Sequence, residues 1–259
     1  MISRLSFLDF RRQVIHGGFG EHYAKYFQPL IDADIFRLVL NHKNLPYETV
    51  WVEGQDIAKT CIAAGIPPLE TRPDGSPRYT LPGLADLTKP EFPVLLTDSR
   101  KIINYLEATY PSPNPEHALF PHGTHAFQAL ADNYFERLIT PLATPLLIYQ
   151  MAQKQTEQVR LAFERYAPSG KTLAEAHLVD KEREEAWCKL RDELDKLGAF
   201  AEGELFFSGD RLRYFDICLL AAFTSTRLSI GDEEFEKELG PSAGGRWVKL
   251  VKARADLIR

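Results

Sequence analysis

The sequence predicts an α+β protein in which a small mixed domain is followed by an all-helical bundle. Up to about residue 110, short runs with alternating or β-branched residues are interleaved with short helical segments. Beyond residue 122, almost every segment has the apolar spacing of a helix. Residues 111–122 contain four prolines and indicate a stiff connection. We therefore expect domains at 1–110 and 123–259, joined by a linker at 111–122.

The first domain is expected to run strand, helix, strand, helix, strand, strand, helix. The strands are rich in β-branched and aromatic residues, and the helices show apolar residues at three- and four-residue spacing. The second helix is ended by Gly65 and the pair Pro67–Pro68. The expected strands are residues 4–10, 47–53, 78–86 and 93–98, and the expected helices are residues 34–44, 57–64 and a third that starts after Asp98–Ser99.

Three helices stand out in the second domain. Residues 180–198 carry one apolar face and stop at a glycine, and residues 215–225 are apolar on all sides, which indicates a buried helix. Residues 127–150 form a long helical pattern that we expect to kink at Pro141 and Pro145. The apolar face of the 180–198 helix consists of Trp187, Leu190, Leu194 and Leu197.

Composition argues against several functions. The chain has 259 residues, a formal net charge of −5 and scattered rather than clustered basic residues, so we expect no nucleic-acid partner. Cys61, Cys188 and Cys218 lie far apart, which indicates free thiols in a reducing compartment and no metal site. No apolar run approaches the roughly 18 residues of a membrane span, and the N-terminus lacks a signal-peptide core. A cytoplasmic protein without a membrane partner is expected.

Residues 79–106 combine a proline that interferes with strand pairing and a helix start that suits an anion. A cis peptide bond before Pro82 would direct the backbone N–H and C=O of Leu81 towards a peptide-like ligand. The helix start at Asp98–Ser99 offers unpaired N–H groups for a carboxylate, and Asp98 can bind an ammonium group. A ligand with one peptide backbone, one α-carboxylate and one α-amine is indicated. γ-Glutamyl-cysteinyl-glycine fits that description.

Each of these features also has an ordinary interpretation. Pro82 alone is typical of an edge strand or a turn, and Asp98–Ser99 alone is typical of a helix N-cap. Two histidines, His122 and His125, lie on the proline-rich linker without a nearby cysteine or acidic partner, so we expect them to be solvated. The aromatic residues Tyr134, Phe135, Tyr149 and Phe223 fit either the core or the lining of a hydrophobic substrate cleft.

In this order and spacing, the two elements resemble the glutathione-binding elements of cytosolic glutathione transferases. Residues 40–86, "LNHKNLPYETVWVEGQDIAKTCIAAGIPPLETRPDGSPRYTLPGLAD", are similar to the fungal etherase-like members of that superfamily. The similarity covers roughly residues 36–121 well and the helical half more loosely. It implies a thioredoxin-like first domain, glutathione as co-substrate and a homodimer. Leu81 and Pro82 match the backbone-pairing element, and Asp98 and Ser99 the γ-glutamyl element.

The chain departs from the family pattern at two places. Asp216 matches a structural acidic residue in the first turn of the buried helix, but Arg213 replaces the usual hydroxyl at its cap, so the cap is weakened or remade. At the position of the family's catalytic serine this chain has Leu30, and the catalytic residue is unknown.

The loss of that serine matters because a thiol with a pKa of about 8.5 is only a few per cent thiolate at neutral pH. Lowering the pKa by two units takes roughly 2.7 kcal/mol. Leu30 supplies no hydrogen bond, and nearby Asp32 or Asp34 would raise the thiol pKa. One of His22, Tyr23 and Tyr26 could donate instead. Alternatively, the reaction needs little thiolate, as in the isomerisation of an activated alkene.

The leading hypothesis is therefore a glutathione-dependent transferase that acts on a hydrophobic electrophile, with glutathione-assisted isomerisation of a secondary metabolite as one form of that activity. The first alternative is a non-catalytic protein of the same fold that binds glutathione or an aromatic ligand, which the loss of the serine favours. A purely structural role is a second alternative, and the retained Asp98–Ser99 pair argues against it.

Overall fold

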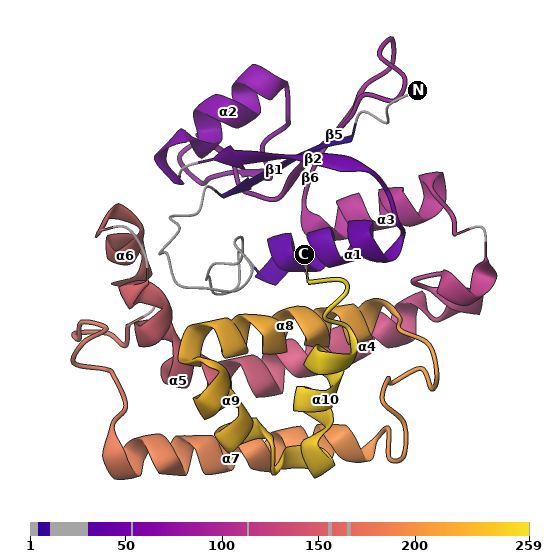
Figure 1. Cartoon of the computed structure of the whole chain (residues 1–259). Coiled ribbons are helices and arrows are strands. Elements are labelled where there is room, and N and C mark those ends of the chain that lie inside the picture. Colours follow the sequence, from indigo (N-terminus) through magenta and orange to yellow (C-terminus); the bar gives the residue numbers. More distant parts are fainter. Residues whose placement is uncertain are drawn as a thin grey trace. The chain divides into compact units, whose positions relative to one another are not determined.

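The structure, a computed structural model, describes residues 5–10, 31–52, 54–112, 114–154, 157–164 and 167–258 (Figure 1). These residues fall into two units, one made of the first strand with residues 31–118 and the other of residues 119–258. The first unit is mixed and the second is helical, which confirms the predicted α+β fold class. Within these ranges, no helix combines the length and apolarity needed to cross a membrane.

The first unit is built on a four-stranded sheet in the order β2-β1-β5-β6. β1 and β2 are parallel, whereas β5 pairs antiparallel with both β1 and β6. β1 and β6 therefore run in the same direction. We call the edge where they end and β5 begins the carboxyl edge, and the opposite edge the amino edge. The strands are β1 (Leu5–Phe10), β2 (Tyr47–Val52), β5 (Gly83–Asp86) and β6 (Val94–Thr97).

Three α-helices accompany this sheet: α1 (Ile31–His42), α2 (Ile57–Ala64), preceded by a short 3-10 turn at Gly54–Asp56, and α3 (Ser99–Thr109). The predicted order is found in the four-stranded sheet and these helices, although α1 begins three residues earlier than expected and two further short strands follow α2. The apolar residues Ile102, Ile103 and Leu106 of α3 are buried, each exposed by 1% or less. α3 begins directly after β6, at the carboxyl edge, and runs back towards the amino edge.

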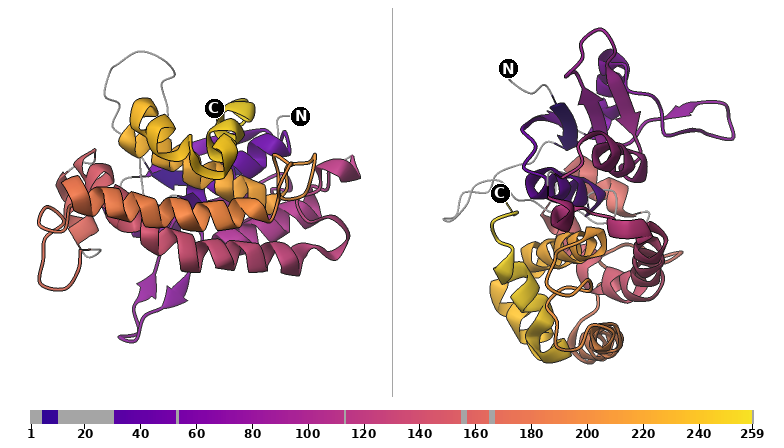
Figure 2. Two further views of the ribbon diagram at one scale, coloured as in Figure 1. Left: turned by 90° about the horizontal axis from the view of Figure 1, so that it is seen from below. Right: turned by 90° about the vertical axis from the view of Figure 1, so that its right-hand side faces the viewer.

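The strand expected at 78–86 is wrong in its first half. Residues 70–78 instead form a separate hairpin of β3 (Glu70–Thr71) and β4 (Pro77–Arg78), which projects from the first unit (Figure 2). Asp74 closes its turn by accepting hydrogen bonds from the backbone N–H and hydroxyl of Ser76 at 2.9 and 2.6 Å. The polar turn at 72–76 thus organises its own hairpin, and β5 starts only at Gly83.

The second unit contains helices that follow the predicted pattern closely. α7 buries all four residues of its predicted apolar face, and α8 is buried over most of its length. The helices are α4 (His125–Tyr134), α5 (Thr140–Gln153), α6 (Glu157–Phe163), α7 (Asp180–Ala199), α8 (Tyr214–Ile230), α9 (Asp232–Leu239) and α10 (Arg246–Ala253). Short 3-10 turns lie at Pro121–Gly123 and Ser242–Gly245 in this unit, and at Pro115–His117 near the end of the first.

The long helical pattern at 127–150 changes its geometry before the prolines rather than at them. Residues Phe135–Ile139 form a π-helical turn between α4 and α5. Pro141 lies in the first turn of α5 and Pro145 inside it. Pro141 has no N–H to donate to the carbonyl of Arg137 four residues earlier, so regular α-helical bonding is interrupted within the π turn.

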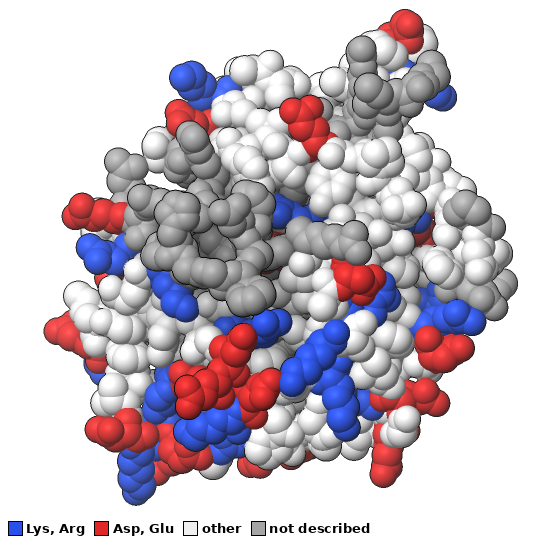
Figure 3. Space-filling model, viewed as in Figure 1, with Lys and Arg blue, Asp and Glu red and all other residues white. Residues whose placement is uncertain are grey.

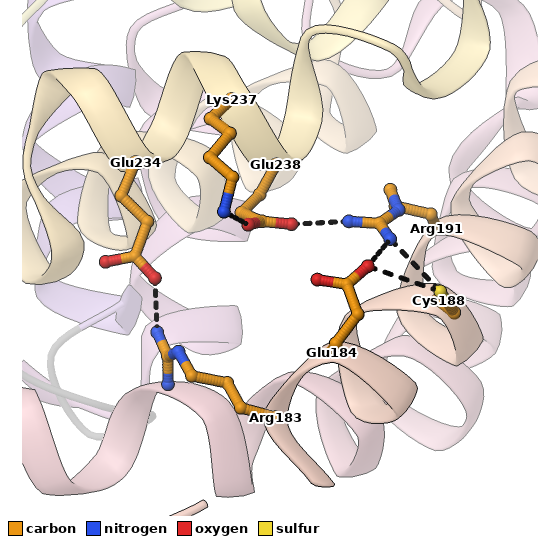
Figure 4. Close-up of polar contacts among 7 residues, drawn as sticks. All are labelled: Arg183, Glu184, Cys188, Arg191, Glu234, Lys237 and Glu238. Carbon is orange, nitrogen blue, oxygen red and sulfur yellow. Dashed lines mark hydrogen bonds and ion pairs between the residues drawn. The ribbon is translucent and has the colours of Figure 1, made fainter. Parts of the chain in front are cut away.

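Ion pairs join α7 to α9 (Figure 4). Arg183 contacts Glu234 at 2.6 Å, while Arg191 bridges Glu184, at 2.7 Å, and Glu238. Glu238 is 3% exposed. A buried carboxylate of this kind is tolerated only when opposite charges lie beside it, and here Arg191 and Lys237 provide them.

The start of α8 shows how the missing cap hydroxyl is replaced. Asp216 accepts hydrogen bonds from the backbone N–H groups of Arg213 and Phe207 at 3.0 and 2.7 Å, which confirms its structural role. The N–H of Phe215, in the first turn, donates to the side-chain oxygen of Gln128 at 3.0 Å. A side chain of α4 therefore does the work of the absent hydroxyl, and the cap is remade rather than lost.

Asp216 carries an unusual pKa. Burial raises it to about 6, even though two backbone N–H groups and the charges of Arg246 and Arg213 favour the ionised form. An unfolded aspartate has a pKa of about 3.9. Between these two values the folded chain binds more protons than the unfolded chain, so a rise in pH lowers the free energy of unfolding.

We therefore expect the stability that Asp216 contributes to be fully present below pH 4 and to be lost as the pH rises through about 6, by about 3 kcal/mol. Urea unfolding of the wild type and of Asp216→Asn from pH 4 to pH 7 measures this. The stability difference between the two proteins should shrink across that range. The exposed-site variant Asp256→Asn should run parallel to the wild type, and an equally parallel curve for Asp216→Asn would contradict the expectation.

A second close contact joins α7 to the 3-10 turn before α10. Asp195 accepts hydrogen bonds from the hydroxyl of Ser242 at 2.7 Å and the N–H of Ala243 at 2.6 Å. A Cβ on Gly198 would lie 2.6 Å from the Cβ of Ala243, far inside van der Waals contact. Only a glycine permits this approach.

Replacing glycine by alanine usually stabilises a helix by up to about 1 kcal/mol. For Gly198→Ala we expect the opposite, a loss of roughly 1–3 kcal/mol in urea unfolding, because the new methyl group overpacks the contact. The double variant Gly198→Ala/Ala243→Gly should recover the loss, since it removes the facing Cβ and relaxes a residue whose φ is 47°. A single variant more stable than the wild type would refute the overpacking argument.

Candidate functional site

The peptide bond between Leu81 and Pro82 is cis, as expected from the sequence. The bond lies directly before β5, at the carboxyl edge of the sheet. The Leu81 side chain is buried in a cluster with Val52, Cys61 and Ile66. Its side chain is therefore fixed against β2 and α2, which holds the neighbouring backbone in place.

The backbone of Leu81 is not used by the sheet. The ladders of β5 begin at Gly83, which lies opposite Leu8 on one side and Thr97 on the other. Among the described residues, neither the N–H nor the C=O of Leu81 forms a backbone hydrogen bond. An extended peptide could therefore pair with this residue as a short added strand.

Asp98 and Ser99 lie next to this segment at the same edge. Because Gly83 pairs with Thr97, Pro82 and Asp98 each stand one residue beyond the paired positions of neighbouring strands. Asp98 has a φ of 80°, which few residues other than glycine adopt. The structure thus brings together all four residues expected at the site, namely Leu81, Pro82, Asp98 and Ser99.

The helix start has the polarity of an anion site. One carboxylate oxygen of Asp98 accepts hydrogen bonds from the N–H groups of Arg100 at 2.9 Å and Lys101 at 3.2 Å, so this side chain caps α3. The N–H of Ser99 has no partner within the described part of the chain. An uncommitted N–H at the positive end of a helix dipole is the donor that a carboxylate requires.

Sequence reasoning missed a polar cluster at the other end of the same elements. Asp86, the last residue of β5, is 2% exposed and accepts hydrogen bonds from the hydroxyls of Tyr105 at 2.6 Å and Tyr110 at 2.5 Å. Thr88 donates both its hydroxyl, at 2.6 Å, and its N–H, at 2.9 Å. Burial opposes ionisation of Asp86, but these donors outweigh it and lower the pKa of the carboxyl group.

A buried ion pair lies at this end of α3 as well. Lys43, just after α1, contacts Glu107 of α3 at 2.6 Å, and its side chain is only 1% exposed. Neither this pair nor the contacts of Asp86 with the two tyrosines has a local sequence signal, because the partners are between 19 and 64 residues apart. The spacing of tyrosines and charges within one helix gives no indication of the strand or helix that they reach.

The described part of the chain does not include Leu30, which stands at the position of the family's serine, or the candidate donors His22, Tyr23 and Tyr26. The prediction about thiol activation therefore stays a prediction. In the described part of the chain, no group of three or more histidine, cysteine or acidic side chains is placed to hold a metal ion.

The four aromatic residues left open between core and cleft now divide. Phe135 and Phe223 are buried, and their rings meet edge to face at 6.4 Å, so they belong to the core. Tyr134 and Tyr149 are partly exposed, and the ring of Tyr149 stacks on His177 at 4.1 Å. Burial and the charge of Arg183 both lower the pKa of His177, so this stacked ring favours its neutral form.

Two family profiles match the chain over most of its length. The profile for the N-terminal domain of glutathione S-transferase matches residues 34–115, and that for the C-terminal domain matches residues 126–257. A comparison with curated protein sequences gave no match.

Solved structures of fungal glutathione transferases are similar over their whole length. CsGST63524 of Ceriporiopsis subvermispora, solved in complex with glutathione, is 27% identical with a TM-score of 0.81, and the match covers 98% of this chain and 97% of that one. CsGST83044 of the same fungus, also in complex with glutathione, is 26% identical with a TM-score of 0.80, over 99% and 100% of the two chains.

GSTFuA3 of Phanerochaete chrysosporium is 27% identical with a TM-score of 0.78, over 99% of this chain and 98% of that one. The family profiles, these fungal structures and the fold agree, and the resemblance drawn from residues 40–86 is confirmed at the level of the family. The chain belongs to the glutathione S-transferase family.

Proposed function

We propose that this protein binds glutathione at Leu81, Pro82, Asp98 and Ser99 and joins the whole tripeptide, through its sulfur, to a hydrophobic electrophile. One observation carries the proposal. A residue whose backbone is unused by the sheet, Leu81, stands at the same edge as the uncommitted N–H of Ser99. The first suits a peptide backbone and the second suits a carboxylate.

The assignment of groups follows from their chemistry. The cysteinyl N–H and C=O of glutathione would pair with Leu81 as a one-residue strand. The γ-glutamyl carboxylate would accept from the N–H and hydroxyl of Ser99, and the γ-glutamyl ammonium would lie beside Asp98. The glutathione complexes of the two similar Ceriporiopsis subvermispora proteins support the choice of this tripeptide.

The chemistry that follows depends on the thiol. With Leu30 at the position of the family's serine, the usual hydroxyl donor is absent. We propose that one of His22, Tyr23 and Tyr26 donates to the sulfur, or that the substrate is activated enough to need little thiolate, as in isomerisation of a conjugated alkene of secondary metabolism. A hydrophobic second substrate, a homodimer, a cytoplasmic location and domains at 1–110 and 123–259 complete the proposal.

A non-catalytic binding protein is the alternative, and Leu30 is the feature that favours it. Turnover separates the two functions. An enzyme consumes a model electrophile, or isomerises a conjugated alkene, at a rate that depends on glutathione, whereas a binding protein retains glutathione without accelerating either reaction.

The γ-glutamyl assignment predicts the effect of Ser99→Ala. Loss of a hydrogen bond from a hydroxyl to a charged carboxylate should raise the Kd for glutathione by about 10- to 100-fold. Calorimetric titration measures this change. Cysteinyl-glycine, which lacks the γ-glutamyl group, should bind the wild type and the variant equally. Equal glutathione affinity of the two proteins would remove the Ser99 hydroxyl from the site, because the variant keeps the backbone N–H.

The thiol argument predicts a gain of function for Leu30→Ser. A hydroxyl donor should stabilise the thiolate and lower the pKa of bound glutathione by about 1–2 units relative to the wild type. Ultraviolet absorbance of the thiolate, followed against pH, gives this value, and the conjugation rate at neutral pH should rise with it. Leu30→Ala is the matched control and should leave the thiol pKa where it is. A pKa already as low in the wild type, and unchanged after removal of His22, Tyr23 and Tyr26, would contradict the donor hypothesis.

A further inference from the structure

The cluster around Asp86 connects the two elements that carry the candidate site. β5 is only four residues long, from Gly83 to Asp86, and Leu81–Pro82 directly precedes it. α3 starts with Ser99 at the same edge and ends near Tyr110. The Asp86 carboxylate at the amino edge therefore joins the C-terminal end of β5 to the C-terminal half of α3. The N-terminal ends of both elements lie at the carboxyl edge, where the ligand is proposed to bind.

The hydrogen bonds of Asp86 have a preferred direction, whereas the apolar contacts of α3 do not. Ile102, Ile103 and Leu106 bury the helix against the sheet, but such contacts permit small shifts along the axis and small rotations. One oxygen of Asp86 accepts from Tyr105, within α3, and from Tyr110, the residue that follows its last, and the other accepts twice from Thr88. One donor within the helix and one at its C-terminal end fix both the rotation of the helix and its position along the axis.

We propose that Asp86 is a positioning residue for glutathione recognition, which sets the place of Ser99 relative to Leu81 by holding Tyr105 and Tyr110. The inference rests on the proposed function, because it concerns how one ligand reaches both halves of the site. Asp86 itself touches neither the peptide edge nor the helix start.

The geometry also explains why the cluster is strong. The carboxylate is 2% exposed and receives four hydrogen bonds of 2.5–2.9 Å, so water does not compete for it. The Lys43–Glu107 pair adds a second attachment of α3, to the end of α1, on the same half of the helix. Both attachments lie on the C-terminal half of α3, away from the turn at Ser99 that is proposed to face the ligand.

The test uses hydroxyl deletions that keep the rings. In Tyr105→Phe/Tyr110→Phe, the apolar contacts stay, and the two donors to Asp86 are lost together with the 3.2 Å contact between the hydroxyls of Tyr110 and Thr88. We expect the Kd for glutathione, measured by calorimetric titration well below the melting temperature, to rise about tenfold, because a ligand that spans both halves depends on their separation. The Kd for cysteinyl-glycine, which needs only the Leu81 half, should stay unchanged.

A matched control separates positioning from general stability. Asp195→Asn removes a comparable carboxylate, bonded to Ser242 and Ala243, from the second unit. It should lower the melting temperature and leave the Kd for glutathione unchanged. If the tyrosine variant behaves like this control, with a lower melting temperature and the wild-type Kd, the inference is overturned and the proposed function stands. If the wild type itself binds no glutathione, the proposed function fails first.

The single variants cover the case in which the double variant does not fold. Tyr105→Phe and Tyr110→Phe each keep one tyrosine and both Thr88 bonds, so each should raise the Kd for glutathione by about two- to fourfold, as fractions of the tenfold change. Wild-type affinity in both single variants would overturn the inference as surely as wild-type affinity in the double variant.

Discussion

The antiparallel pairing of β5 with both of its neighbours is the constraint on which the rest of the first unit depends. Because β1 and β6 each run opposite to β5, they end at the edge where β5 begins. The helix that follows β6 must therefore start beside the segment that precedes β5. Leu81 and Ser99 are 18 positions apart in the chain, yet the ladder places them at one edge. The location of the site therefore depends first on the directions of the strands and only then on the side chains.

Much of this could be predicted from the sequence, since the signals were local. The cis bond at Pro82, the helix start at Ser99, the buried face of α7 and the buried helix α8 each rest on residues within one or two turns of each other. The hairpin at 70–78 was missed because its strands have only two residues each, too few for an alternation to show. The register of the paired strands could not be predicted either, because the sequence pattern of one strand does not show which residues of another strand lie opposite.

Sequence reasoning also missed side-chain hydrogen bonds between different helices and strands. Gln128 caps a helix that begins 86 residues later, and Asp86 receives its donors from a helix that starts after the next strand. Both are buried polar groups that find partners, as burial demands, but the sequence does not say which partners. At Arg213 the linear pattern indicated a cap that is weakened or remade, and the side-chain amide of Gln128 shows that it is remade.

The π-helical turn at Phe135–Ile139 has a geometric consequence for the helix behind it. Each residue of an α-helix advances the chain by about 100° around the axis, so one extra residue in a turn changes the phase of everything that follows. Gln128 before the turn and Leu146 and Met151 after it are buried. Shortening this segment by one position would rotate α5 by more than a quarter of a revolution and turn its buried side chains towards water. The wider π turn therefore sets which side of α5 is buried.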